Sequence, residues 1–398
     1  MHREEKNKIT KEREGNELIV ISSGYPNETG DYLLHTFVKG FVDEAKGYYE
    51  IINVIVLLPH IPLPFGKSID KLPKGLASYS YDNVNVIYEK YPYIPIWPFT
   101  KFKGRIAYFF SSSKVLNLVN VNSVIHANFT SPAGVFANLI CKKTNKDYTL
   151  TVHEDHDWLM HEIKSNNSLL ISTWKNAKTI IRVNKLDNII LRRFNKNIIT
   201  IPNGYNHRKF KALDKEDCRG KLKITNKKYV VVNIGFYNEQ KNQKLLIDAV
   251  ELLPDSLKNN LKCFIIGGGP KQQELQDHVD AMKLNVTIEI VGQVKHDELP
   301  LYLNAADVFC LSSNSEGNPT VMFEALGAGI PYVGSNVGGV PEIIISEEYG
   351  FLCNPKSVKE LTVVLEKGLN KKWNKDKIIE YSKQFSWKEI FLATRQNY

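Results

Sequence analysis

The 398-residue sequence has no hydrophobic run long enough to cross a membrane. Its longest apolar stretch, residues 51–65, is interrupted by His60 and three prolines, whereas a membrane-spanning helix needs about 20 consecutive apolar residues. Residues 1–16 are mainly charged and polar, unlike a secretory signal peptide. We therefore expect a flexible tail over residues 1–16 and no membrane span.

Cysteine is also scarce. The five cysteines are scattered and none forms a C-x-x-C pair, so neither a zinc site nor a disulfide framework is indicated. Low-complexity tracts and internal repeats are absent from the sequence, which argues against disordered and solenoid classes. The chain is 43% hydrophobic and 24% charged, and it is long enough for two domains with separate cores. A reduced, cytoplasmic protein is the simplest expectation.

Charge is unevenly distributed along the chain. Residues 301–350 contain no lysine or arginine and six acidic residues, whereas residues 101–200 contain 15 basic and six acidic residues. Residues 91–110 interleave aromatic, proline and basic residues. Two interpretations of this basic, aromatic region remain open. It forms solvated helix faces and core packing around a long loop, or it contacts an anionic membrane or an acidic acceptor. No nucleic-acid-binding motif is present, so we expect no nucleic-acid partner.

Short apolar runs alternate with helical patterns through the first half of the chain. The runs predict buried strands at residues 18–23, 51–58, 85–88, 123–129, 148–153, 178–183 and 198–201. Helices are predicted at residues 31–46 and 132–143. This alternation predicts an α/β domain with a largely parallel sheet over residues 17–203. Pro202, Asn203 and Gly204 then form a strong turn signal.

Two polar side chains follow predicted strands of this first domain. Asn128 and His153 lie at the carboxyl ends of their strands, where open α/β sheets bind ligands, although a lone histidine there is more often structural. The cluster from His153 to Asp157 does not have the H-E-x-x-H spacing of zinc proteases, because position 157 is Asp. We therefore expect no metal site.

The pattern restarts at residues 229–235 as the first strand of a second α/β domain, which we expect to cover residues 204–381. Further strands are predicted at residues 261–269, 286–293, 306–311 and 330–333. A final helix, residues 382–398, is expected to join the first domain. Lys241 lies just before a predicted helix, where its ammonium could meet a diphosphate, or it is a solvated loop lysine.

Residues 312–342 link two predicted strands of this second domain through a helix. Asn318 is a good N-cap and Pro319 suits the first helical position, and the helix should end near residues 327–329. A helix N-terminus favours a phosphate. Glu316, in the loop, and Glu324, in the helix, could accept hydrogen bonds from ligand hydroxyls, although either alone could be an ordinary surface residue. A phosphate flanked by hydroxyl-rich groups describes a nucleotide sugar.

The spacing of Glu316 and Glu324 resembles the E-x7-E motif of retaining glycosyltransferases with the GT-B fold. The surrounding E-G-N-P-T-V-M-F-E-A-L-G-A-G-I-P and the following G-G-V-P-E-I-I are similar to glycosyltransferase family 4. The resemblance covers essentially the whole chain, strongly over residues 200–355 and weakly over residues 1–120. It implies an α/β GT-B fold in which two Rossmann-like domains face each other across a central cleft.

The resemblance also implies a function. A sugar would move, with retention of configuration, from a nucleotide sugar, most simply a UDP-sugar, to a hydroxyl of a saccharide or lipid-linked acceptor. The N-terminal domain would bind the acceptor and the C-terminal domain the donor, with no metal or cofactor. Polysaccharide or glycoconjugate biosynthesis would be the setting, in the cytoplasm or at the inner face of the membrane.

The resemblance also implies roles for particular residues. His153, Glu316 and Lys241 form the implied catalytic group: His153 and Glu316 would contact the donor sugar, and Lys241 the diphosphate. Glu324 would bind the ribose diol, and Asn128 the acceptor. The implied donor-binding set is Gly30, Gly235, Gln293, Val294, Glu316, Gly317, Asn318, Pro319, Thr320, Val321 and Glu324.

One position departs from the family pattern. Phe236 stands where relatives usually carry an arginine beside the diphosphate, so one cation is missing. Two alternatives therefore stay open beside the enzyme: a non-catalytic nucleotide-sugar-binding homologue and a GT-B sugar-nucleotide epimerase.

Overall fold

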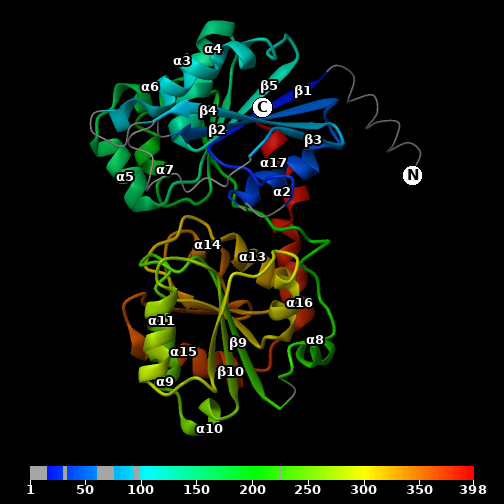
Figure 1. Ribbon diagram of the computed structural model, residues 1–398, viewed down its shortest axis with the longest axis vertical. Helices are drawn as coiled ribbons and strands as arrows, with labels where there is room; N and C mark the ends of the chain where they lie inside the picture. Colours follow the sequence, from blue (N-terminus) through cyan, green and yellow to red (C-terminus); the bar gives the residue numbers. More distant parts are fainter. Residues whose placement is uncertain (1–15, 30–33, 61–75, 94–98, 225) are drawn as a thin grey trace, which may run out of the picture. The chain divides into compact units, whose positions relative to one another are not determined.

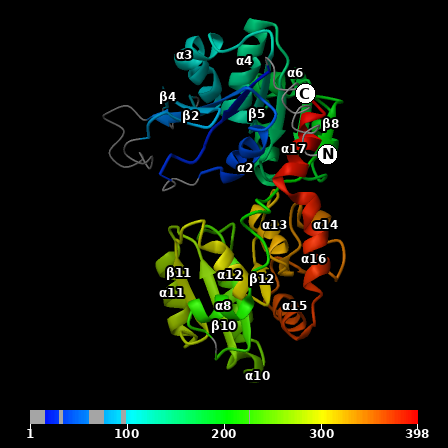
Figure 2. The ribbon, with the colours of Figure 1, turned by 90° about the vertical axis from the view of Figure 1, so that its right-hand side faces the viewer.

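A computed structural model describes residues 16–29, 34–60, 76–93, 99–224 and 226–398. The chain divides into two compact units, Met1–Pro202 with Ile390–Tyr398, and Asn203–Glu389. Each unit contains one sheet with helices on both faces (Figures 1 and 2). The predicted tail, Gly30 and part of the 91–110 segment lie outside the described residues.

The first unit contains an eight-stranded sheet in the order β3-β4-β2-β1-β5-β6-β7-β8. All neighbours are parallel except β3, which pairs antiparallel with β4 at one edge. The strands are β1 (Glu17–Ser22), β2 (Ile51–His60), β3 (Tyr79–Tyr81), β4 (Val84–Pro92), β5 (Ser123–Asn128), β6 (Thr149–Val152), β7 (Thr179–Arg182) and β8 (Ile198–Thr200).

The order of the strands reverses between β1 and β5. The chain runs outward from β1 through β2 to β4 and then returns to pair β5 with the other side of β1. Such a reversal leaves a crevice at the carboxyl ends of the two central strands, where α/β proteins bind ligands. Ser22 and Asn128 are the last residues of these two strands.

The helices of the first unit cover both faces of its sheet. They are α2 (Thr36–Ala45), α3 (Lys103–Leu116), α4 (Val135–Thr144), α5 (His156–Lys164), α6 (Ser168–Asn176), α7 (Asn188–Leu191) and α17 (Trp387–Arg395), with short helical turns at Phe99–Phe102 and Thr130–Gly134. The chain crosses from the second unit back to the first within α17.

The second unit contains six parallel strands in the order β11-β10-β9-β12-β13-β14. They are β9 (Tyr229–Ile234), β10 (Leu261–Ile266), β11 (Ile288–Gly292), β12 (Val308–Leu311), β13 (Tyr332–Ser335) and β14 (Gly350–Cys353). Here the order reverses between β9 and β12. The carboxyl ends of β9 and β12 therefore form a second position of the kind at which α/β proteins bind ligands.

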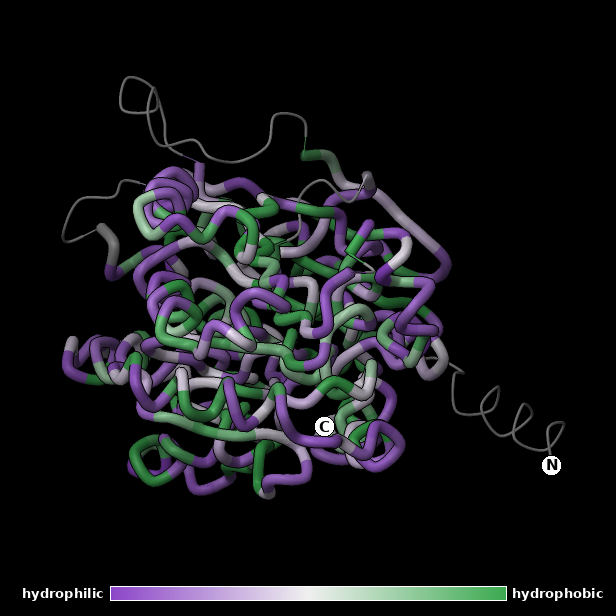
Figure 3. Tube along the Cα trace, turned by 90° about the horizontal axis from the view of Figure 1, so that it is seen from below, coloured by the Kyte–Doolittle hydropathy of each residue, from purple (hydrophilic) through white to green (hydrophobic). Residues whose placement is uncertain are grey.

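Alternate residues of β9, a central strand of the second unit, pack in two separate hydrophobic cores. Val230 and Val232 pack in one cluster, and Val231 packs in the other, as the two-residue period of a strand requires. The outer turns of the trace are largely hydrophilic, whereas hydrophobic segments gather mostly in the interior (Figure 3). The helices are α8 (Lys215–Lys221), α9 (Gln243–Glu251), α10 (Asp255–Lys258), α11 (Gln272–Ala281), α12 (Leu299–Ala305), α13 (Thr320–Gly327), α14 (Val340–Ile343), α15 (Val358–Asn370) and α16 (Lys375–Ser382).

The predicted start of the helix in residues 312–342 is wrong by one position. Pro319 is extended, with φ −72° and ψ 116°, and α13 begins at Thr320. Asn318 does not cap the helix, because its side-chain oxygen accepts a hydrogen bond from the backbone of Asn203 instead. The end of the helix, at Gly327, falls where it was predicted.

The described part of the aromatic, basic segment 91–110 contains both buried and exposed residues. Tyr91 and Ala107 are buried, whereas Phe109 and Phe110 are exposed. Among the described residues no helix combines the length and apolar character needed to cross a membrane.

Candidate active site

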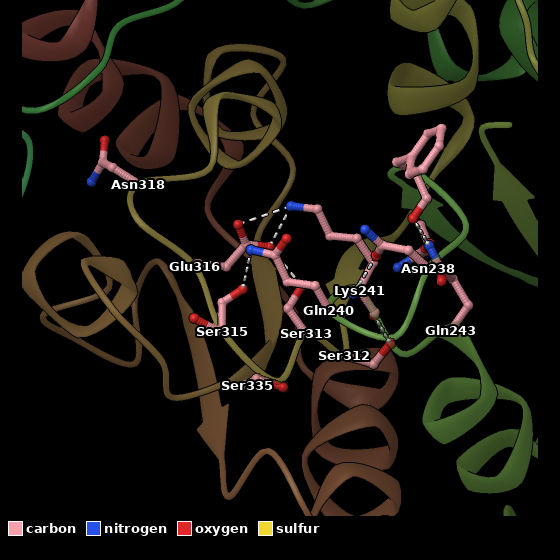
Figure 4. A network of polar contacts seen from close by, with 12 residues as sticks. Asn238, Gln240, Lys241, Gln243, Ser312, Ser313, Ser315, Glu316, Asn318 and Ser335 are labelled. Carbon is pink, nitrogen blue, oxygen red and sulfur yellow. Dashed lines mark hydrogen bonds and ion pairs between the residues drawn. The ribbon is translucent and has the colours of Figure 1, made fainter. Parts of the chain in front are cut away.

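Two loops meet at the carboxyl edge of the second sheet, one following β9 and the other following β12. The amide of Asn314 donates to the Gln240 carbonyl at 2.7 Å, and the Gln240 side-chain amide donates to the Ser315 carbonyl at 3.1 Å. The Ser312 hydroxyl donates to the carbonyl of Lys241 at 3.3 Å (Figure 4). These reciprocal bonds hold residues 236–242 and 312–317 as one platform.

A glycine fixes a third chain segment against this platform. Gly338 has a left-handed backbone with φ +53°, and a Cβ there would lie 1.7 Å from the carbonyl oxygen of Glu316. The next amide, that of Gly339, donates to the Gly317 carbonyl at 3.0 Å. Only glycine permits both the backbone conformation and this close approach, so the loop after β13 supports Glu316 from behind.

Lys241 and Glu316 form an ion pair at the centre of the platform. The ammonium contacts Oε1 at 2.6 Å and Oε2 at 2.8 Å, and the Ser313 hydroxyl donates to Oε1 at 2.6 Å. The Glu316 side chain is 5% exposed and that of Lys241 is 21% exposed. The sequence assigned these residues to separate ligand groups and did not predict that they contact each other.

The loop positions Lys241 through its own backbone. The side chain of Asn238 accepts from the amide of Lys241 at 2.9 Å, and Asn242 adopts a left-handed conformation before α9 begins. An ammonium has three donors, and two of them point to Glu316. The third can serve a ligand.

Asn318 is directed away from the Lys241–Glu316 pair (Figure 4). Its side-chain oxygen accepts from the amide of Asn203, and the Asn203 side chain donates to the Asn318 carbonyl, both at 2.8 Å. The Asn318 side chain therefore fastens the turn at residues 202–204 to the start of α13. Among the described side chains none caps this helix, so the first turn, with Thr320 and Val321, keeps its amide donors for other partners.

Glu324 lies on α13 beside a histidine that the sequence did not single out. His296 Nε2 lies 3.2 Å from Glu324 Oε1, and its Nδ1 lies 2.6 Å from the Lys209 ammonium. Because an ammonium can only donate, Nδ1 accepts and Nε2 carries the proton donated to Glu324. The arrangement occupies one oxygen of Glu324. His296 follows closely after Gln293 and Val294 of the implied donor-binding set, a signal that could have pointed to it.

Three further residues of the predicted donor-binding set, Gln293, Val294 and Gly235, directly follow the strands β11 and β9 of the same sheet. Gln293 is exposed and Val294 half-buried, directly after β11. A Cβ at Gly235 would meet the Lys241 side chain at an ordinary 3.5 Å, so sterics alone do not require glycine there. Phe236 is 57% exposed, and its carbonyl accepts from the Gln243 side chain at 3.2 Å.

In the first unit, the structure brings His153 and Asn128 together. His153 Nε2 lies 3.0 Å from Asn128 Oδ1, with the rings of Phe37 and Phe129 at 4.6 and 4.9 Å from the imidazole. Burial, reinforced by the nearby His35, lowers the pKa of His153 well below its usual value. The neutral ring therefore donates from Nε2 to Asn128. Its Nδ1 has no partner among the described residues and can accept from a hydroxyl.

His35 is a further residue of this group that sequence reasoning missed. It has a left-handed backbone at the start of α2 and stacks on Phe129 at 4.6 Å. Its Nδ1 lies 3.3 Å from the Ser22 hydroxyl at the end of β1. Burial lowers the pKa of His35 to about 4, so a second neutral imidazole lies at the reversal point of the first sheet.

The other histidines of the His153 loop do not gather into a metal site. His156 instead contacts the buried Asp187 at 2.6 Å. Within the described ranges, no group of three or more His, Cys, Asp or Glu side chains could hold a metal ion.

Comparison with solved structures identifies the fold. Anabaena Alr3699/HepE in complex with UDP superposes with a TM-score of 0.71 at 18% identity, over 96% of this chain and 98% of that chain. Sucrose-phosphate synthase from Thermosynechococcus elongatus gives the same values. With its two doubly wound sheets, the protein has the GT-B fold, as predicted.

The sequence comparisons add a family match that lies within the second unit. Residues 214–385 match the family "Glycosyl transferases group 1". An uncharacterized glycosyltransferase of Methanocaldococcus jannaschii is 26% identical over 87% of this chain and 99% of its own length.

Two further relatives match over shorter ranges. The putative teichuronic acid biosynthesis glycosyltransferase TuaC of Bacillus subtilis is 29% identical over 60% of this chain and 59% of its own length. The phosphatidylinositol N-acetylglucosaminyltransferase GPI3 subunit of Saccharomyces cerevisiae is 28% identical over 51% of this chain and 45% of its own length. The matches thus span about half the length of these two relatives.

Proposed function

We propose that the protein is a retaining glycosyltransferase of family 4. It transfers a sugar from a nucleotide sugar, most simply a UDP-sugar, to a hydroxyl of a saccharide or lipid-linked acceptor in glycoconjugate biosynthesis. The observation that carries this proposal is the Lys241–Glu316 pair at the reversal point of a sheet, within the residues that match the group 1 family. Metal independence and a cytoplasmic location, with peripheral contact at the inner face of the membrane, belong to the proposal.

The donor diphosphate is assigned to Lys241 and the first turn of α13. The third donor of the Lys241 ammonium contacts a phosphate oxygen, and the amides of Thr320 and Val321 add the positive end of the helix dipole. Negative charge on the leaving diphosphate grows as the bond to the sugar breaks. These fixed donors therefore stabilise the transition state more than the bound substrate, which is the requirement for catalysis.

The donor hydroxyls are assigned to the two carboxylates. A carboxylate has about four acceptor positions. Glu316 uses part of this capacity for Lys241 and Ser313, and the remainder accepts from sugar hydroxyls. Glu324 uses one oxygen for His296, and the other accepts from the ribose diol. The main-chain groups of Gln293 and Val294 are assigned to the nucleobase.

The residues at the first sheet are assigned to the reacting sugar and the acceptor. The neutral His153 keeps an accepting Nδ1, which suits a sugar hydroxyl better than a cationic imidazole would. Asn128 holds the other ring nitrogen and offers its own amide group to an acceptor hydroxyl. Names of similar proteins support a UDP donor and a glycoconjugate product, since HepE was solved with UDP and TuaC is named for teichuronic acid biosynthesis.

Donor affinity provides the first test. UDP, GDP and ADP are compared by the thermal stabilisation that each gives the full chain, because a ligand that binds the folded state raises the melting temperature. UDP should stabilise most. Transfer is then measured with a panel of UDP-sugars and acceptors. A protein that none of these nucleotides stabilises would contradict the proposal.

The two alternatives give different results in the same experiments. The exposed Phe236, which supplies no cation beside the diphosphate, is the observation that favours a non-catalytic binder. Such a protein would bind UDP-sugar tightly but would show no turnover with any of the acceptors. An epimerase would convert the donor sugar in the absence of any acceptor.

A further inference from the structure

A cavity of about 490 Å³ opens in the first unit beside α5. This volume is within the range of about 300–1,000 Å³ usual for small-ligand sites. Its wall includes Lys101 and Lys103 at the start of α3, Trp158 and Glu162 from α5, and Ser165 and Asn167 before α6. His153 and Asn128 do not line it, so the proposed donor and acceptor contacts leave the cavity without a role.

Glu162 is a buried carboxyl in this wall that lacks a complete set of partners. The residue is 6% exposed, and its Oε2 has no hydrogen-bond partner among the described residues. Burial, and then the neighbouring Glu154, raise the pKa of Glu162 to about 8, while Lys103 opposes the shift. At neutral pH the group is a carboxylic acid that can donate a hydrogen bond. An unpartnered buried polar atom is costly, and a ligand oxygen would remove this cost.

An aromatic ring forms the outer part of the same wall. Trp158 is 52% exposed, although tryptophan has the largest of the apolar side chains. The His161 ring lies 5.9 Å from it, and the Lys103 ammonium lies 6.0 Å from its ring centre. An exposed indole face beside polar groups suits a ligand with one apolar face and a polar rim. A sugar ring, with C–H groups on one face and hydroxyls around the edge, has this character.

The charge of the wall favours an anionic ligand. Lys101 and Lys103 bring two positive charges to the wall, and Glu162 is the one acidic side chain among its described residues. The wall is also held in place before a ligand arrives. The Asn167 side chain donates to the Lys101 carbonyl at 3.0 Å, and the Ser165 hydroxyl donates to the Glu162 carbonyl at 2.6 Å. Binding groups that are positioned in advance lose less entropy when they bind.

We propose that this cavity binds a saccharide carrying an anionic group, either a carboxylate or a phosphate, as part of the acceptor. The sugar ring lies on Trp158, a ring or anion oxygen accepts from the Glu162 carboxyl, and the anionic group contacts Lys101 and Lys103. The assignment as an acceptor site rests on the proposed glycosyltransferase function. The binding of an anionic saccharide does not, and can be tested separately.

Three probes distinguish the contribution of the charge to binding from that of the sugar ring. They are methyl β-D-glucuronide, α-D-glucose 1-phosphate and the neutral methyl β-D-glucoside. Their affinities for the full chain are measured by calorimetry, together with the change in tryptophan emission. We expect one or both anionic probes to bind at least about tenfold more tightly than the glucoside. Preference for the glucuronide identifies a uronic acid, and preference for the phosphate identifies a phosphosugar. Equal affinity for all three probes, or binding of none, overturns the proposal.

Substitutions then place the binding in the cavity. The double variant K101A/K103A should lose about tenfold in affinity for the preferred anionic probe. Lys164→Ala, on the same helix as Trp158 but outside the wall, is the matched control and should bind like the unaltered protein. Trp158→Phe should keep most of the affinity and lose the emission change. Unaltered affinity in K101A/K103A overturns the proposal, provided that its melting temperature matches the control.

UDP binding is measured on the same samples to separate the two proposals. If K101A/K103A binds UDP normally and loses the saccharide, both proposals stand. If UDP does not bind but the anionic saccharide does, with the same dependence on the lysines, the donor site fails and the cavity remains a saccharide site. If UDP binds and no anionic saccharide does, the cavity proposal alone fails.

Discussion

The ammonium of Lys241 contacts both carboxylate oxygens of Glu316, which lies 75 residues further along the chain. The two loops that carry these residues follow β9 and β12, the strands between which the sheet order reverses. A buried carboxylate and its cation thus lie where the fold leaves space for a ligand. Loss of either partner should therefore affect the folded state or the reaction of the donor.

Lys241→Ala should lower the free energy of unfolding by about 3 kcal/mol, because Glu316 would remain buried without its cation. Urea denaturation measures this change. The double variant K241A/E316Q removes the charge as well and should recover part of the loss, as a double-mutant cycle would show. Equal stability of K241A and the unaltered protein would mean that solvent replaces Lys241 fully.

Glu316→Gln and Glu324→Ala should affect different steps. Glu324→Ala should weaken UDP binding by about tenfold, because the ribose diol loses an ionised acceptor. Glu316→Gln should leave UDP affinity nearly unchanged and reduce transfer by about 100-fold, in keeping with an interaction made to the reacting sugar. Calorimetry with UDP and initial rates with UDP-sugar distinguish the two. If both variants keep normal affinity and turnover, the site assignment is wrong.

Gly338→Ala should destabilise the protein by about 2 kcal/mol or more and weaken UDP binding. The added methyl group would overlap the Glu316 carbonyl in a left-handed backbone. Gly220→Ala is the matched control, because nothing lies within 4 Å of a Cβ at this position in α8. The control should gain up to about 1 kcal/mol, since alanine favours the helix. Thermal denaturation of the pair checks the prediction, which fails if Gly338→Ala behaves like Gly220→Ala.

Glu162→Gln should change how stability depends on pH. The folded protein keeps Glu162 protonated up to about pH 8, whereas the carboxyl of the unfolded chain ionises near its usual pKa of about 4.3. Between these values the folded state binds more protons, so this group costs increasing stability as pH rises, by up to about 1.4 kcal/mol per pH unit.

Removing the carboxyl removes this dependence. Glu162→Gln should therefore gain stability relative to the unaltered protein as pH increases from 5 to 8, in denaturation curves collected across that range. Glu154 and Lys103 act on the same carboxyl in opposite directions, so the gain measures their net effect with burial. Parallel stability curves for the two proteins would show that Glu162 has an ordinary pKa.

Phe236→Arg should strengthen UDP binding by about tenfold by placing a cation beside the proposed diphosphate site. The exposed side chain makes a loss of folding unexpected. Phe236→Gln serves as the uncharged control and should show no gain. If Arg and Gln give the same affinity and rate, position 236 does not face the diphosphate.

The sheets were the part of the fold that the sequence predicted well. Strand β12 is a short, wholly apolar run, and β9 is apolar except for Asn233. Such runs are typical of parallel sheets buried on both faces. Strand β14 went unpredicted, because Gly350–Cys353 begins with a glycine and its two central residues are only half-buried, unlike the fully buried four-residue strand β12. Helix α13 begins one residue later than predicted, because Asn318 bonds to Asn203, a partner 115 positions earlier.

The sequence named candidate residues for the site but not the contacts between them. Lys241, Glu316 and Glu324 could be named from local motifs, whereas the Lys241–Glu316 pair depends on how two distant loops meet. The His296 ring became a candidate only when it lay between Glu324 and Lys209. For the cavity beside α5, the sequence singled out only the segment 91–110, for which contact with an acidic acceptor was one open interpretation. The rest of the wall comes from separate segments that the sequence did not connect.

The neutralised Lys241 has a consequence for ligand discrimination at the proposed donor site. A sulfate ion would have to compete with Glu316 for the ammonium, and it has no hydrogen-bond donor that could compensate that carboxylate. A nucleotide sugar brings hydroxyl donors that compensate Glu316 while its diphosphate takes a share of Lys241. The pair of residues therefore favours a ligand in which both chemical groups arrive together, and it keeps abundant simple anions from occupying the site.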